Sequence, residues 1–152
     1  MRPEPRVFLD TSALFAGIWS AEGGARMLLR LGEAGVVHLL LSAQVLREID
    51  VVLRRKSERH LPTLAILIDR SRAEVVKDAP PQLVQQCQVW IPHVGDAHIL
   101  ADAWYAQVDF LATLDKQHFL QAERRGVQLP VSVGTPGDCL AWLRDLWGPG
   151  MD

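Results

Sequence analysis

The sequence predicts an α/β protein in which helices cover a mostly parallel sheet. Three observations carry this prediction. Short, continuous apolar runs such as residues 36–41 have the length and composition of strands that are buried on both faces. Longer segments with helical apolar spacing separate these runs, as helices do between parallel strands. No proline-, glycine- or serine-rich linker divides the 152 residues, so we expect a single domain over residues 1–152.

Apolar spacing and capping residues define the elements of the first half. Met27, Leu28 and Leu31 give the first predicted helix an apolar side. Ser42 ends the second apolar run, and its hydroxyl suits the N-cap of the helix that follows. The predicted order is strand 7–10, helix 20–34, strand 36–41, helix 43–56, helix 59–72 and strand 74–76.

The second half continues the alternation. Pro80 and Pro81 open a helical stretch, because proline is favoured in a first turn. Residues 92–95 interrupt it, and the last helix is amphipathic through Leu140, Leu143 and Trp147. The predicted order is helix 80–90, helix 96–107, strand 110–114, helix 118–125, strand 127–133 and helix 135–147.

Composition excludes some classes of function. The chain is 49% hydrophobic and 22% charged, as soluble globular proteins are, with a formal net charge of −2. Binding of nucleic acid would therefore need a local basic patch. Cys87 and Cys139 lack metal-ligand spacing and are expected to be free thiols, with a disulfide between them as the alternative. Neither a signal peptide nor a membrane span is apparent, so we expect a cytoplasmic protein without membrane contact.

Acidic residues fall on the edge of the predicted sheet where ligands bind. Asp10 ends the first strand and Asp115 follows strand 110–114, which places both beyond carboxyl ends. Asp96 opens a helix after Gly95. A carboxylate at the edge of a core needs a compensating partner, so each acid either caps a helix or turn, forms a salt bridge or meets a metal ion.

Helix 43–56 carries two further acids. Glu48 and Asp50 lie on opposite borders of its apolar stripe, so either could face the sheet edge. Helical periodicity does not choose between them.

Three motifs together resemble the PIN domain family. They are LDTSALFAG at the first strand, VLREID in the helix after the second strand, and GDAHILADAWYAQVDFLATLDKQHF. The likeness is to compact bacterial PIN proteins of the VapC toxin type, and it covers residues 6–133, with helix 135–147 beyond it. It implies a three-layer α/β/α sandwich around a parallel sheet of about five strands.

The resemblance also implies a site. It selects Glu48 over Asp50, and it implies one or two Mg²⁺ or Mn²⁺ ions, which oxygen ligands suit. Many relatives carry a second acid beside the position of Asp96, where this chain has Gly95, and this difference bears on the second ion. The implied catalytic and metal-binding residues are Asp10, Glu48, Asp96 and Asp115, and the implied site-lining residues are Thr11, Ser12, Thr113 and Lys116.

The implied function is hydrolysis of RNA phosphodiester bonds by a metal-dependent endoribonuclease. A toxin of this type would have a protein antitoxin as partner, and an exposed Trp142–Trp147 face would mark an antitoxin or homodimer surface, although core packing is the expectation there. The alternative is a PIN-like module that binds RNA or protein without catalysis. Candidate phosphate contacts, which a solvated helix end also explains, are Arg54, Arg55, Lys56 and Arg59.

Histidines beside Asp96 raise the question of zinc. His93 and His98 flank this acid, but a spacing of five across a loop and a helix start is no compact ligand motif. Structural roles are therefore the prediction for both.

Overall fold

The computed structural model describes residues 3–148 and confirms the predicted α/β fold. Residues 1–2 and 149–152, the ends of the predicted domain, lie outside the described residues. All strand pairs are parallel, and the strand order is β3-β2-β1-β4-β5. The strands are β1 (Arg6–Leu9), β2 (His38–Ser42), β3 (Glu74–Val76), β4 (Phe110–Ala112) and β5 (Ser132–Gly134).

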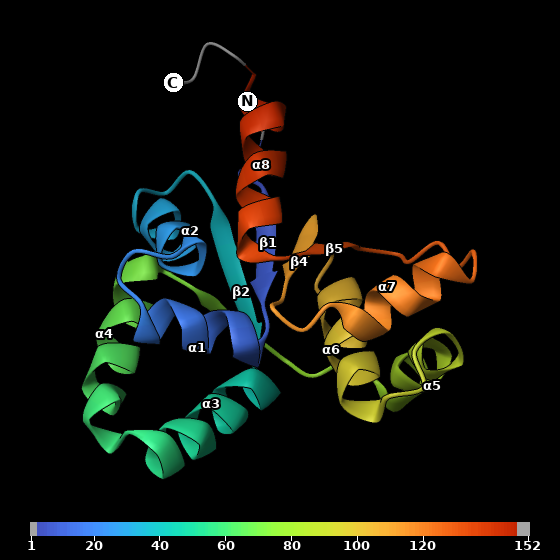
Figure 1. The fold of residues 1–152 in the computed structure, drawn as a ribbon, viewed down its shortest axis with the longest axis horizontal. Helices are drawn as coiled ribbons and strands as arrows, with labels where there is room; N and C mark the ends of the chain where they lie inside the picture. Colours follow the sequence, from blue (N-terminus) through green and yellow to red (C-terminus); the bar gives the residue numbers. More distant parts are fainter. Residues whose placement is uncertain (1–2, 149–152) are drawn as a thin grey trace.

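Helices cover both faces of this sheet, as in a three-layer α/β/α sandwich. In Figure 1, α1, α2 and α4 lie on one side of the strands, and α5, α6 and α7 lie on the other. The last helix, α8, packs on α2 and on β4 and β5. The helices are α1 (Thr11–Trp19), α2 (Gly24–Glu33), α3 (Ala43–Lys56), α4 (Leu61–Ser71), α5 (Pro81–Trp90), α6 (Val94–Tyr105), α7 (Gln117–Arg124) and α8 (Pro136–Trp147).

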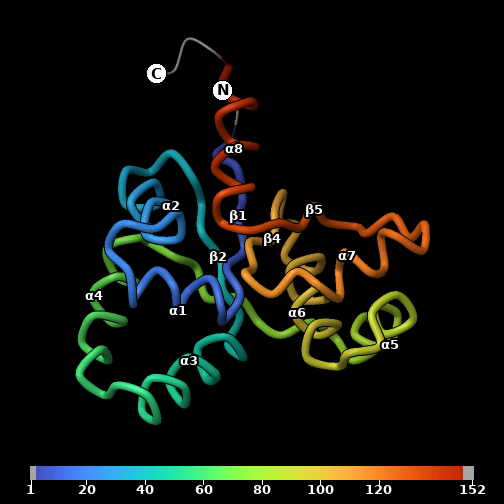
Figure 2. The backbone as a smooth tube through the Cα atoms, viewed as in Figure 1, coloured from blue at the N-terminus to red at the C-terminus, as the bar shows by residue number. Residues whose placement is uncertain are grey.

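The central strands form the core because their side chains are apolar on both faces. Val7, Phe8 and Leu9 of β1 are fully buried, as are Leu39–Leu41 of β2. Removing this apolar surface from water is the main force that holds the layers together. The tube in Figure 2 shows that the chain leaves β1 and β2 at the same lower edge and turns there into α1 and α3. None of the described helices has the length and apolarity needed to cross a bilayer.

The structure corrects the prediction between the first two strands. Residues 11–19 form α1, where no element was predicted, and the predicted helix 20–34 begins only at Gly24. Helix α1 is short and apolar almost throughout, so it carries little amphipathic signal. The predicted helix 59–72 is divided into a 3-10 turn, Glu58–His60, and α4. Pro62 suits the first turn of α4, and Arg72 ends it in the left-handed region with φ of 58°.

Boundaries in the second half also shift. Helix α6 begins at Val94 rather than at Asp96, because the side chain of His93 caps it. The predicted strand 127–133 is wrong over most of its length: β5 holds only Ser132–Gly134, and Pro130, which has no N–H to donate, precedes it. The predicted strand 110–114 ends at Ala112, and residues 113–116 form an irregular segment before α7.

Two predictions of local packing are confirmed. The hydroxyl of Ser42 accepts a 3.2 Å hydrogen bond from the Val45 N–H and caps α3. At the C-terminal helix, Leu143 is fully buried and the Trp142 ring packs on Phe110 with 5.4 Å between centroids. Core packing is therefore the main role of this face, although Leu146 is 44% exposed.

Candidate active site

Asp10 lies at the carboxyl end of β1 and caps α1. Its Oδ1 accepts hydrogen bonds from the Ala13 N–H at 2.9 Å and from the Ser12 hydroxyl at 2.7 Å. Its Oδ2 accepts the hydroxyl of Thr113, which follows β4, the neighbouring strand. The Asp-Thr-Ser sequence thus ends a strand, starts a helix and fixes a carboxylate on the sheet edge.

The electrostatic surroundings of Asp10 are unfavourable to its charge. The residue is 8% exposed, and this burial raises the pKa of its carboxyl above the ordinary value of 3.8. The negative charge of Asp96 raises the pKa further, while the hydrogen bonds from Thr113, Ala13 and Ser12 lower it. The donors to this carboxylate within residues 3–148 are all neutral, so it has no cationic partner there.

Glu48 reaches the same edge from the second turn of α3. Its Oε2 accepts the Thr11 hydroxyl at 2.6 Å, and its Oε1 accepts the Gln44 amide at 2.8 Å. Asp50 instead pairs with Arg54 at 2.9 Å, one helical turn away on the same helix. The structure thus distinguishes two acids that helical periodicity left equivalent, because only Glu48 contacts the first turn of α1.

The segment after β4 supplies hydroxyl and carboxylate groups. Thr113 is fully buried, and its hydroxyl also accepts the Asp115 N–H at 3.1 Å. The Ser12 hydroxyl accepts the Leu114 N–H at 3.0 Å, which ties this segment to α1. The Asp115 side chain is exposed and forms no hydrogen bond or ion pair within the described part of the chain.

Lys116 points away from the acids. Its Nζ forms a 3.0 Å ion pair with Asp138 in the first turn of α8. There Asp138 belongs to a capping box with Thr135, and these contacts lower its carboxyl pKa. Lys116 therefore connects the segment after β4 to α8.

Asp96 lies in the first turn of α6 between two histidines. The Nδ1 of His93 is 3.3 Å from Asp96 Oδ2, and the Nδ1 of His118, in α7, hydrogen-bonds the same oxygen. Potential ligand atoms of these three residues lie within 4.8 Å of one another. No other group of three His, Cys, Asp or Glu residues in the described ranges does so, the four predicted acids included.

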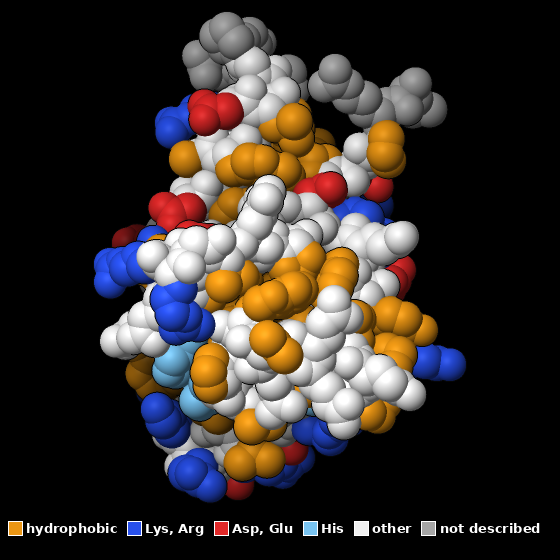
Figure 3. All heavy atoms as spheres, turned by 90° about the vertical axis from the view of Figure 1, so that its right-hand side faces the viewer, with side chains coloured by type: hydrophobic (Ala, Val, Ile, Leu, Met, Phe, Trp, Pro, Cys, Tyr) orange, Lys and Arg blue, Asp and Glu red, His pale blue; other side chains and the backbone are white. Residues whose placement is uncertain are grey.

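His118 was not predicted as a site residue, and structural roles were predicted for His93 and His98. His98 has such a role, since it pairs at 3.1 Å with the fully buried Asp102, which also accepts the Ala79 N–H. His118 gave no local signal, because its partner Asp96 is 22 residues away in the sequence. Figure 3, which faces the side of α5, α6 and α7, shows histidine side chains together on the surface with Lys and Arg side chains near them.

The predicted basic residues lie at the far end of α3. Arg54 is engaged by Asp50, while Arg55 and Arg59 are exposed. Lys56 is exposed too, with its Nζ 5.5 Å from the centre of the Phe15 ring. Three of the four cations are thus free of an ion pair within residues 3–148.

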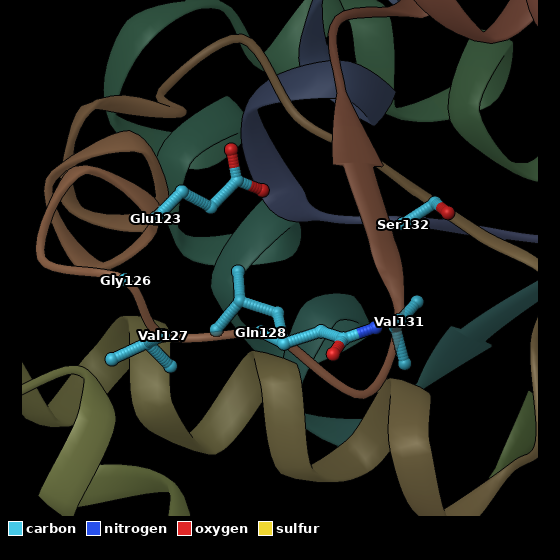
Figure 4. Close-up of a pocket in the computed structure, with 7 residues that line it drawn as sticks. Glu123, Gly126, Val127, Gln128, Val131 and Ser132 are labelled. Carbon is cyan, nitrogen blue, oxygen red and sulfur yellow. The ribbon is translucent and has the colours of Figure 1, made fainter.

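A separate hollow lies between the end of α7 and β5 (Figure 4). Its volume is about 420 Å³, and none of the predicted site residues lines it. Its lining residues are Glu123, Gly126, Val127, Gln128, Leu129, Val131 and Ser132.

Fold and site together define a three-layer α/β/α protein with carboxylates at the carboxyl edge of its sheet. The family model of the PIN domain matches residues 6–117, and the chain belongs to this family. No curated protein matches the chain significantly.

Three solved structures share this fold at low sequence identity. VapBC2 from Rickettsia felis, bound to a DNA fragment from its promoter, aligns with a TM-score of 0.66 and 16% identity over 86% of this chain and 98% of that one. VapC20 from Mycobacterium tuberculosis, a toxin that cleaves the sarcin–ricin loop, aligns with a TM-score of 0.54 and 18% identity over 76% of this chain and 94% of that one. A protein from Pyrobaculum aerophilum aligns with a TM-score of 0.55 and 16% identity over 84% of this chain and 95% of that one.

Proposed function

We propose that this PIN domain protein is a metal-dependent endoribonuclease whose site is the carboxyl edge around Asp10. The observation that carries the proposal is the buried Asp10 carboxylate, whose donors among residues 3–148 are all neutral and which has the charge of Asp96 near it. Burial makes the charge of such a carboxylate costly, and a bound cation would compensate it.

The donor set fits a hard divalent cation. Asp10, Asp96, Asp115 and Glu48 would hold Mg²⁺ or Mn²⁺ through carboxylate oxygens, with water completing the coordination. When bound, such an ion polarises a phosphate and lowers the pKa of a coordinated water. The proposal covers one ion or two, and the dependence of cleavage on metal concentration distinguishes them.

The remaining site residues orient the acids. Thr11 fixes Glu48 through a 2.6 Å hydrogen bond, so its carboxylate is placed either as a ligand or as a base that orients the attacking water. Ser12 and Thr113 hold the two oxygens of Asp10 and leave its remaining lone pairs for a ligand. Asp115 is exposed, so its carboxylate would be accessible to an arriving substrate.

Three stacked rings, those of Phe15, Trp19 and His60, form an aromatic column that supports single-stranded RNA as the substrate. Helices α1 and α3 are joined near their starts by Thr11 and Glu48, and Trp19 and Lys56 each lie eight residues further on, about 12 Å along a helix. The Trp19 ring stacks on Phe15 at 5.6 Å and on His60 at 4.9 Å, yet Trp19 remains 53% exposed. Exposed aromatic rings beside cations bind unpaired bases and their phosphates.

The cations at this end complete the proposed RNA path. Lys56 lies against the Phe15 ring of the column, and Arg55 and Arg59 belong to the same end of α3 and to the turn after it. Ser57 fixes the His60 ring through a 2.7 Å hydrogen bond, so the column is ordered before RNA binds.

Likeness of fold to VapC proteins supports the proposal of a toxin role. One structure with this fold is VapBC2 bound to a DNA fragment from its promoter, and another is a toxin that cleaves the sarcin–ricin loop. We therefore propose that the chain has a protein antitoxin as its partner in the cytoplasm. A homodimer is proposed as a further assembly, and the chain is proposed to form a single domain.

Cleavage of end-labelled single-stranded and structured RNAs in Mn²⁺ or Mg²⁺ tests the nuclease proposal. The wild type should cleave only with metal, and Asp96→Asn and Asp115→Asn should each lose most activity. Asp145→Asn, at an exposed position of α8, is the matched control and should remain active.

Equal activity in all four preparations would reveal a contaminating ribonuclease. Binding of these RNAs without cleavage, at every metal concentration, would support the alternative of a PIN-like binding module.

A further inference from the structure

We infer that His93, Asp96 and His118 form a binding site for one divalent transition-metal ion, such as Zn²⁺ or Co²⁺. The site would use two imidazole nitrogens and one carboxylate oxygen. It is distinct in chemistry from the all-oxygen site proposed for Mg²⁺ or Mn²⁺, although Asp96 belongs to both. Its existence does not depend on nuclease activity.

Three potential metal ligands from two helices lie within 4.8 Å of one another. His93 and Asp96 lie at the start of α6, and His118 comes from α7. Both Nδ1 atoms approach the same oxygen, Asp96 Oδ2, and the two imidazole rings stack with 4.6 Å between their centroids. Ligand atoms about 2.1 Å from one tetrahedral ion lie roughly 3.4 Å apart, close to the 3.3 Å between His93 Nδ1 and Asp96 Oδ2. To bind the same ion, the His118 Nδ1 would exchange its hydrogen bond to Oδ2 for a bond to the metal and move slightly back.

The Nδ1 atom of His93 has two neighbours on Asp96, the N–H donor and the Oδ2 acceptor, and it cannot satisfy both. This nitrogen accepts the Asp96 N–H at 3.2 Å as the cap of α6, so in that role it carries a lone pair and no proton. The same atom then cannot donate to Asp96 Oδ2 at 3.3 Å, and a lone pair faces a carboxylate oxygen. A cation bound by Nδ1 and by the carboxylate would remove this repulsion. Because Nδ1 has a single lone pair, the Asp96 N–H would then give up its hydrogen bond to that atom.

The surroundings of the three side chains leave room for the His93 ring and let an ion reach Asp96. A Cβ at Gly95 would lie 3.3 Å from Cε1 of His93, so glycine gives the imidazole room beside the helix start. The side chains of His93 and His118 are 55% and 37% exposed, and that of Asp96 is 17% exposed. An ion can therefore reach a carboxylate that is itself largely shielded from water.

The donor set selects the class of metal. Imidazole nitrogen favours Zn²⁺, Co²⁺, Ni²⁺ and Cu²⁺, whereas Mg²⁺ prefers oxygen ligands alone. Thiols do not compete, because Cys87 and Cys139 are fully buried and burial raises their pKa values to about 11 and about 12.

Co²⁺ titration of the full chain, followed by visible absorption in excess Mg²⁺, tests the inference. We expect a single saturable site, with affinity lowered at least about tenfold in His93→Gln and in His118→Gln. His38→Gln, a partly exposed histidine on β2, is the matched control and should bind as the wild type does. Unchanged affinity in both ligand variants, or no saturable binding, would overturn the inference.

Two further measurements test the histidine site without substituting its ligands. In wild-type protein, Zn²⁺ should shift the ring resonances of His93 and His118 and leave those of His38, His60 and His98 in place; the reverse pattern would refute the site. Asp115→Asn should keep Co²⁺ affinity even though it should lose RNA cleavage. Co²⁺ binding by a wild-type protein that cleaves no RNA would refute the nuclease proposal alone.

Discussion

A single carboxylate at Asp10 meets two opposing demands. The end of β1 needs a cap for α1, which its Oδ1 supplies through the Ala13 N–H. The same position is buried, and burial disfavours the charge that a good cap carries. Ser12 and Thr113 reduce the conflict, and a bound cation would remove it.

Replacement of Asp10 by asparagine should raise the melting temperature of the metal-free protein at neutral pH. Asparagine keeps an oxygen for the Ala13 N–H and carries no charge to bury. Because the folded-state pKa of Asp10 is raised, the wild type loses stability as pH rises from 3.8 through that pKa. The advantage of Asp10→Asn should therefore be largest at neutral pH and shrink on acidification.

Thermal melts from mildly acidic to neutral pH, with and without Mn²⁺, measure this effect. Mn²⁺ should raise the melting temperature of the wild type and do so less for Asp10→Asn. A variant that is less stable than the wild type at neutral pH, with an unchanged response to Mn²⁺, would contradict the proposal that Asp10 is a metal ligand whose buried charge lowers the stability of the metal-free protein.

Some residues of the candidate site could be predicted from the sequence and others could not, for physical reasons. The position of Asp10 followed from strand direction alone, because parallel strands share a carboxyl edge. Glu48 could not be separated from Asp50 by periodicity, since the difference is the contact of Glu48 with Thr11 in another helix. His118 was out of reach because only the packing of α7 beside α6 brings it to Asp96.

At the scale of elements, α1 and α3 connect the acids to the aromatic column. Their starts meet at Thr11 and Glu48, and their ends carry Trp19 and Lys56. Helix α3 could be predicted in full because a capping serine and a clear apolar stripe define it. Helix α1 could not, because its near-uniform apolarity reflects burial among the sheet and neighbouring helices rather than one exposed face.

Loss of the α3 cap should destabilise the protein without moving the acids far. Ser42→Ala removes the acceptor of the Val45 N–H and should cost about 1 kcal/mol, with a drop in melting temperature of about 2–4 °C. Chemical denaturation measures the loss. Ser132→Ala, at an exposed position of β5, is the control, and equal stability losses in the two variants would argue against the cap.

Truncation of Trp19 should weaken binding of single-stranded RNA. Stacking of one base is worth about 1–3 kcal/mol, so Trp19→Ala should raise the Kd by roughly 5- to 150-fold, while Trp19→Phe keeps part of the stacking. Fluorescence anisotropy of labelled RNA with Asp115→Asn protein measures binding without cleavage. Equal affinity of the alanine variant and the parent would place the RNA elsewhere.

At the scale of the molecule, the charge distribution limits how RNA can bind. The net charge is −2, so the whole protein does not attract polyanions, and binding depends on the local group of Arg55, Lys56 and Arg59. This group lies at the end of α3 and in the turn after it, whereas Glu48, nearer the start of α3, contacts Thr11 next to Asp10. RNA that spans both would keep its backbone on the cations and one phosphate at the acids.

Salt should weaken this binding moderately. Three phosphate contacts on a single strand predict a slope of roughly −2 in a plot of log affinity against log salt concentration. Arg55→Ala should reduce the slope by about 0.7, whereas Arg144→Ala, on α8, should leave it unchanged. An identical slope in all three proteins would exclude the α3 end as the phosphate contact.

The most direct test of a metal site at Asp10 is the anomalous-scattering map of a crystal soaked in Mn²⁺. We predict a peak between the carboxylates of Asp10 and Asp96, within coordination distance of both. No peak beside Asp10 at saturating Mn²⁺, or Mn²⁺ found only between His93 and His118, would contradict the claim that the buried carboxylate at the end of β1 is there to hold a metal ion.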